Sequence, residues 1–132
     1  MGGGPRVWKA GGGKIVLRPS ADNLADVRPL LARILDALGV NAAARLLGVD
    51  RAQVSRWKAG KELVGAELAR RIVDLHDVLT RILRVYHRDA AAMWLVGSEP
   101  LPGGARPIDV LVSQGASPVI RAIDGIAAGA HA

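Results

Sequence analysis

The stretch VNAAARLLGVDRAQVSRWKAG, residues 40–60, decides the fold that this sequence predicts. It is typical of a helix-turn-helix, with short helices over 40–47 and 51–58 that cross at a steep angle. The small Ala44 stands where the helices touch, and Gly48 permits left-handed backbone at the turn. Asp50 can cap the second helix. Apolar residues supply the inward faces, and these are Ala43, Leu47, Val49, Val54 and Trp57.

The polar side chains of the second helix are left on its outward face. Arginine and glutamine suit paired contacts with guanine and adenine edges, and residues near the helix ends lie where DNA phosphates would pass. The candidate DNA-binding residues are Asn41, Arg51, Ala52, Gln53, Ser55, Arg56, Lys58 and Lys61. The alternative is a motif that serves only for packing or dimerisation. We expect Trp57 to be a core residue and not a base-stacking one.

The positive charge is concentrated in the half of the chain that contains this motif. Residues 1–64 hold eleven Lys and Arg against five Asp and Glu, whereas residues 65–132 hold seven of each. A localised basic excess favours a polyanionic partner such as operator DNA. The alternative is a basic surface that only aids solubility.

Composition favours an all-α protein without cysteine chemistry or a membrane span. Half of the 132 residues are hydrophobic, yet Phe is absent, so the core must be built from Leu, Ile, Val and Ala. The absence of Cys excludes disulfides and thiolate metal sites and fits the cytoplasm. No apolar run approaches the roughly 20 residues that span a membrane, and we see no apolar signal core.

The chain divides into three expected parts. Residues 1–20 are a flexible, Gly-rich basic arm, residues 21–64 are the helix-turn-helix domain, and residues 65–132 are a helical C-terminal domain. Apolar spacing and capping residues predict further helices. They run from near Pro29 to Gly39, over 65–87, from an Asp89 cap to Val96, from Ile108 to Val112 after Pro107, and from a Ser117 cap to Gly129.

The longest of these helices joins the two domains and carries a heptad-like apolar seam. Its members are three or four residues apart, and they are Leu68, Ile72, Leu75, Leu79, Ile82 and Tyr86. Such a seam is typical of a long core helix or of a helix that pairs with its copy in a homodimer. The sequence leaves both interpretations open.

We find no residues that would make this chain an enzyme. His76, His87 and His131 are the only histidines, and none has a partner at metal-ligand spacing. Ser113 and Ser117 lack the context of a nucleophile. We therefore expect a binding protein with no catalytic residues, cofactor or metal.

The C-terminal half carries an ordered set of short apolar motifs. They are AAMWL at 91–95, Leu101, PIDVL at 107–111, VIRAIDGI at 119–126 and Gly129. Over residues 28–132 the chain resembles the Xre/MbcA/ParS antitoxins, in which an Xre-like helix-turn-helix precedes a toxin-binding domain. The Gly-rich first 20 residues lie outside this resemblance.

The resemblance implies a cognate RES-domain toxin, which consumes NAD or transfers ADP-ribose from it. The antitoxin would block the toxin's active site, and would dimerise within a larger complex and repress its own operon. The residues implied in toxin binding are Trp94, Leu101, Pro107, Arg121, Asp124, Gly129, Ala130, His131 and Ala132. Trp94, Leu101 and Ile108 have an alternative role in the core. The other functional class is an Xre-type regulator whose C-terminal half only dimerises.

Overall fold

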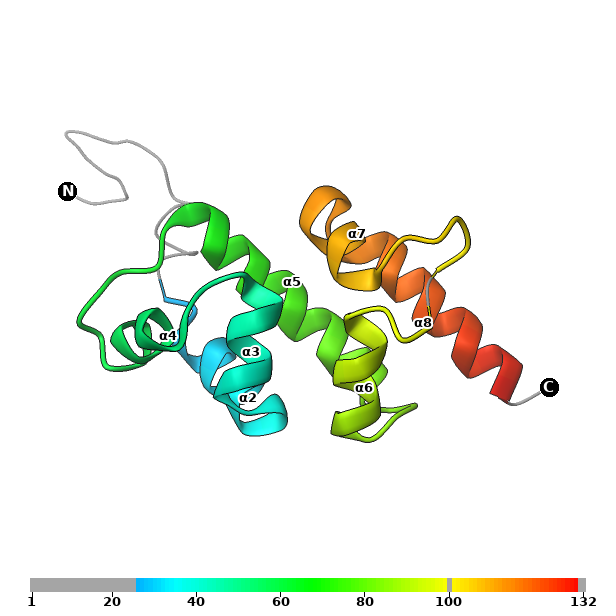
Figure 1. Cartoon of the computed structure of the whole chain (residues 1–132), viewed down its shortest axis with the longest axis horizontal. Helices are drawn as coiled ribbons and strands as arrows, with labels where there is room; N and C mark the ends of the chain where they lie inside the picture. Colours follow the sequence, from blue (N-terminus) through cyan, green and yellow to red (C-terminus); the bar gives the residue numbers. More distant parts are fainter. Residues whose placement is uncertain (1–25, 100, 131–132) are drawn as a thin grey trace, which may run out of the picture.

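A computed structural model describes residues 26–99 and 101–130 (Figure 1). Regular structure within these residues is entirely helical, which confirms the all-α prediction. The expected arm over residues 1–20 lies outside the described residues. The helices are α2 (Arg28–Leu38), α3 (Val40–Leu47), α4 (Arg51–Lys58), α5 (Ala66–Ile82), α6 (Arg88–Leu95), α7 (Pro107–Gln114) and α8 (Ala116–Ala130).

Helix α5 lies in the middle of the molecule and packs against helices from both halves (Figure 1). Helices α2 and α3 contact it on the N-terminal side, and α7 and α8 contact it on the C-terminal side. Helix α6 lies between α2 and α7. Helix α4 and the C-terminal end of α8 therefore lie at opposite ends of an elongated molecule.

The core is formed by aliphatic side chains around α5. Ile72, Leu75, Leu79 and Ile82 are at most 3% exposed, although only a single chain is present. These four seam residues are thus buried by contacts within the chain, as expected of a core helix. Leu68 and Tyr86, at the two ends of the seam, are half-buried.

Helix α5 is shorter than the predicted 65–87, because the chain turns after Ile82. Leu83 caps the helix, and the N–H groups of Arg84 and Val85 donate to carbonyls three residues earlier. Tight bonds of this kind end a helix and redirect the chain. Tyr86 consequently packs against the core from a turn and not from α5.

Two predicted caps are wrong. His87 is the N-cap of α6, without a side-chain cap bond, and Asp89 lies inside the first turn, where its charge still favours the helix dipole. Helix α7 continues to Gln114, so Gly115 alone separates it from α8. Ser117 is therefore already inside α8, which continues through Gly129 to Ala130.

The central position of α5 predicts a large effect of truncating its core side chains. Leu75→Ala should lower the free energy of unfolding by about 2–5 kcal/mol, since it removes fully buried methyl groups and leaves a cavity. Urea denaturation measures this loss. The matched control is Leu63→Ala, because Leu63 is 87% exposed and its truncation should change stability by less than about 0.5 kcal/mol. Equal effects of the two substitutions would contradict the assignment of α5 as the core helix.

Candidate nucleic-acid interface and partner-binding surface

Helices α3 and α4 have the bounds predicted for them and are joined by residues 48–50. Gly48 has φ +73° and ψ 31°, the left-handed conformation expected of it. The Val49 N–H donates to the Ala44 carbonyl at 3.0 Å, which closes the end of α3. Asp50 Oδ1 accepts from the Gln53 N–H at 2.7 Å, so the predicted cap of α4 is confirmed.

The inward faces of α3 and α4 are buried as predicted. Ala43 and Val54 are 0% exposed and Trp57 is 1% exposed, so Trp57 is a core residue. Its indole N–H has no hydrogen-bond partner among the described residues. Burial of these side chains fixes which face of α4 is turned outward.

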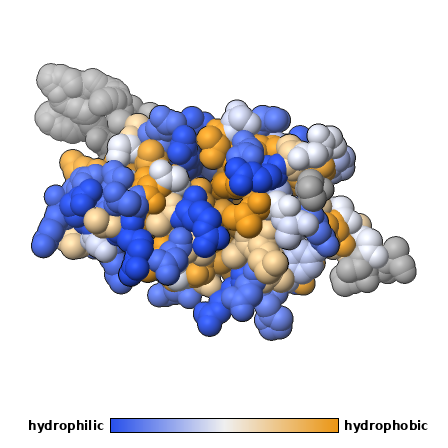
Figure 2. Space-filling view, in the orientation of Figure 1, coloured by the Kyte–Doolittle hydropathy of each residue, from blue (hydrophilic) through white to orange (hydrophobic). Residues whose placement is uncertain are grey.

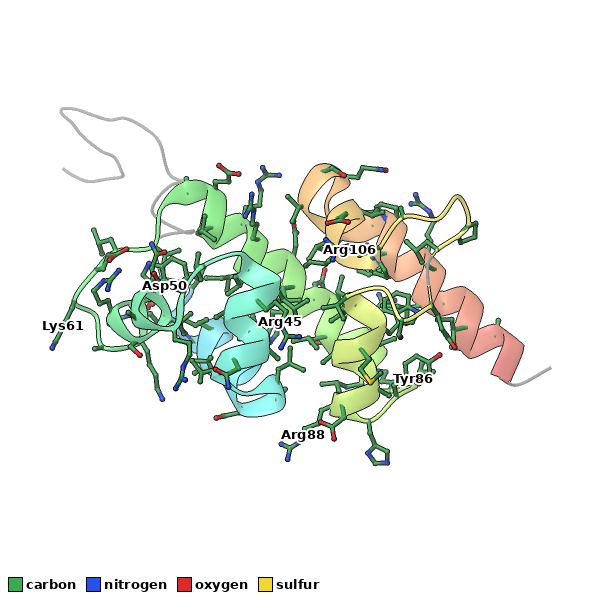
Figure 3. All side chains as sticks on the ribbon, viewed as in Figure 1. Arg45, Asp50, Lys61, Tyr86, Arg88 and Arg106 are labelled. Atoms are coloured by element: carbon green, nitrogen blue, oxygen red, sulfur yellow. The ribbon has the colours of Figure 1, made fainter. Side chains whose placement is uncertain are left out.

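The candidate DNA-binding side chains are accessible. Gln53 is half-buried, and the other seven are exposed, namely Asn41, Arg51, Ala52, Ser55, Arg56, Lys58 and Lys61. Six of the eight come from α4, Asn41 comes from the first turn of α3, and Lys61 follows α4. Asp50 and Lys61 lie at the same end of the molecule (Figure 3), and hydrophilic residues make up much of the surface seen at that end (Figure 2).

Glu62 also belongs to this surface, and the sequence reasoning missed it. Its Oε1 accepts from Arg56 Nε at 2.7 Å, and its Oε2 accepts from Gln53 Nε2 at 3.0 Å. These bonds lower the pKa of the Glu62 carboxyl, the contact with Arg56 contributing most, and the same contact raises the pKa of Arg56. Two candidate base-reading side chains are thus joined by one carboxylate.

The turn after α4 brings Glu62 into position. The Lys61 N–H donates to the Arg56 carbonyl at 2.9 Å, and the Gly60 N–H donates to the Trp57 carbonyl at 3.1 Å. Gly60 has φ +75°, so this is the Schellman termination, which folds the chain back along the helix. An acidic residue two positions after a terminating glycine was the sequence signal that could have identified Glu62.

Three cations of this surface remain available to a polyanion. Arg51, Lys58 and Lys61 take part in none of the ion pairs between described residues, whereas Arg56 is paired with Glu62. The arrangement thus combines cations that are outside the ion pairs of the described residues, near the ends of α4, with an amide and a guanidinium held by Glu62 on its outward face.

The residues implied in toxin binding divide into a buried and an exposed group. Trp94 is 3% exposed, Pro107 is buried and Leu101 is half-buried. These side chains therefore pack in or against the core and present little surface to a partner. Ile108, at 8% exposed, is also a core residue. The exposed group is Arg121, Asp124 and Gly129, all on α8. Ala130 is the last residue of α8, and His131 and Ala132 lie outside the described residues.

Within the described part of the chain, α8 makes a polar contact with α5 in addition to packing its apolar face on the core. Asp124 Oδ1 accepts from Arg81 Nη1 of α5 at 3.3 Å. Val119 and Ile123 are at most 2% exposed and pack on the core. Arg121 is outside the ion pairs of the described residues and is free to contact a partner.

Two grooves lie where the halves of the molecule meet. One, of about 490 Å³, is lined by the end of α2, by α3 and by α6, and includes Met93, which is 59% exposed. The other, of about 220 Å³, lies between Arg45, Arg71 and Arg106, beside Val112. Arg45 and Arg106 are labelled in Figure 3. Figure 2, in the same orientation, shows apolar residues exposed in the middle of the face that is turned to the viewer.

The described residues contain no cluster of three or more His, Asp or Glu side chains that could hold a metal ion. No helix in the described part of the chain is long and apolar enough to cross a membrane. Comparison of the chain with models of known protein families, with curated proteins and with solved structures finds no match.

The Arg56–Glu62 contact predicts a measurable titration. Glu62 should titrate below its ordinary pKa, and Arg56→Ala should move that pKa upward, since the largest stabilising contact of the carboxylate is removed. The pKa of Glu62 is lower in the folded protein than in the unfolded chain, so the Arg56–Glu62 contact stabilises the fold at pH values above the unfolded pKa. This stabilisation is lost as the pH falls through the folded pKa. Carbon-detected NMR of the side-chain carboxyl follows the change.

The control for this titration is Arg71→Ala. It breaks the Arg71–Glu67 pair, 2.9 Å in length, on a different helix. The pKa of Glu62 should stay unchanged in that variant. An unchanged Glu62 pKa in Arg56→Ala itself would contradict the contact.

Proposed function

We propose that this chain is the antitoxin of a toxin–antitoxin pair, which binds and neutralises a RES-domain toxin in the cytoplasm. The observation that carries the proposal is the form of α8. The helix presents exposed Arg121, and its last turn is formed by small residues at one end of the molecule. Such an end can enter a cleft without large side chains standing in the way.

The inhibitory mechanism follows from this shape. A RES-domain toxin must admit NAD to its active site, so a helix end that occupies the entrance excludes the substrate. Exposed Ala128 and Gly129 permit close approach of the backbone, and Arg121 lies two turns earlier, where it can form a polar contact on the rim. Docking would then depend on the body of α8, and inhibition would depend on its end.

Separation of these two roles is the test of the antitoxin proposal. Deletion of residues 127–132 should leave a stable complex with a cognate RES-domain toxin, while rescue of growth on co-expression should fall. Co-purification measures binding, and toxin-dependent loss of NAD measures inhibition. Lys61→Ala, at the opposite end of the molecule, should leave both unchanged. Failure of the full chain to form a complex or to restore growth would refute the proposal.

We propose in addition that α4 reads operator DNA and that a homodimer represses its own operon. Support comes from the exposed outward face of α4 and from Arg51, Lys58 and Lys61, which are outside the ion pairs of the described residues. Two copies would read half-sites about 34 Å apart, one turn of DNA. Without toxin binding, the function supported would be that of an Xre-class regulator whose C-terminal half only dimerises.

Base contacts and phosphate contacts can be distinguished by substitution. Arg51→Ala and Gln53→Ala should each reduce discrimination at one base position by about 1–3 kcal/mol. Lys58→Ala should weaken binding to all duplexes alike and lower the slope of affinity against salt by about one. Fluorescence anisotropy at several salt concentrations gives both quantities. Salt-sensitive binding without any sequence preference would contradict operator recognition.

A further inference from the structure

Glu62 lies against the outward side of α4 and contacts two of its side chains at once. One carboxylate oxygen accepts from Arg56 Nε at 2.7 Å, and the other accepts from Gln53 Nε2 at 3.0 Å. The three residues come from α4 and from the turn that Gly60 forms after it. The backbone bonds of that turn hold Glu62 beside the helix, so the contacts do not depend on a free loop.

The chemistry of these bonds fixes the orientation of both partners. An ionised carboxylate only accepts hydrogen bonds, so the amide nitrogen of Gln53 must face Glu62. The amide oxygen of Gln53 is then directed away from Glu62, together with one remaining N–H. Arg56 uses Nε for Glu62, which leaves the hydrogens on its two terminal nitrogens for another acceptor.

We propose that Glu62 is a specificity-determining residue, which sets the orientation in which Gln53 and Arg56 meet the base edges of DNA. The inference rests on the proposed DNA binding by α4. A glutamine reads adenine by accepting from N6 and donating to N7, which requires one amide orientation. Holding that orientation before binding removes the need to order the side chain on the DNA.

Glu62 also reduces the attraction of this surface to DNA in general. It neutralises the charge of Arg56, which would otherwise add to the sequence-independent affinity for phosphates. Loss of Glu62 should therefore raise affinity for unrelated duplexes while it lowers preference for the operator. A residue with only a structural role would lower stability and leave that preference unchanged.

The test uses the full chain with Glu62→Gln and the matched control Glu67→Gln. Glu67 is exposed and, like Glu62, is paired with an arginine (Arg71, at 2.9 Å), so the control makes the same charge change away from α4. The operator is first selected from random duplexes with the unsubstituted protein. Affinities for that duplex and for a scrambled one are then measured at a single salt concentration.

The ratio of operator affinity to scrambled affinity should fall at least about fivefold in Glu62→Gln, the lower limit for one paired base contact. Repeated selection with this variant should give a changed base at the position that Gln53 contacts. The new amide would keep its oxygen toward Arg56, which only donates, and would turn its nitrogen toward Gln53. The Gln53 amide would then reverse, with its oxygen toward residue 62. Glu62→Ala, which releases both side chains, should lower the ratio without a new preferred base. Glu67→Gln should keep the ratio.

An unchanged ratio in Glu62→Gln and Glu62→Ala would overturn this inference and leave operator binding standing. An equal fall in Glu67→Gln would overturn it too, because the cause would then be net charge. Failure of the unsubstituted protein to select any sequence would overturn both the inference and the proposed DNA binding. Unfolding curves of each variant confirm that the folded protein is being compared.

Discussion

Burial of the apolar stripe of α5 is the constraint on which the rest of the structure depends. Ile72, Leu75, Val78, Leu79 and Ile82 are covered by helices from both halves of the chain. Apolar burial is the main favourable contribution to folding, and α5 packs against α2, α3, α7 and α8. The position of α4 at one end and of the α8 terminus at the other follows from what packs on α5.

The parts of the fold that the sequence predicts well are those in which local chemistry is decisive. Residues 40–58 combine a left-handed glycine, an Asp cap and a set of inward apolar residues, and both helix bounds agree with the structure. Apolar periodicity likewise locates the buried part of α5. In each case, the residues that decide the conformation lie within a few positions of one another.

The predictions that differ from the structure concern features decided by contacts between distant segments or by competing local bonds. The seam continues to Tyr86 in the sequence, but the helix ends at Ile82, because the pattern is also satisfied by a turn that packs Tyr86 on the core. Ser117 resembles a cap, yet α8 already begins at Ala116. Glu62 was overlooked because its role depends on the chain folding back at Gly60.

The sharing of one core helix also determines how the two ends of the molecule can evolve. A replacement of α2, α3 and α4 by an unrelated unit would have to bring side chains that cover the same flank of α5. A replacement of α7 and α8 would have to cover the other flank. Exchange of modules by recombination is therefore constrained, and the two ends of this protein should descend as a single inherited unit.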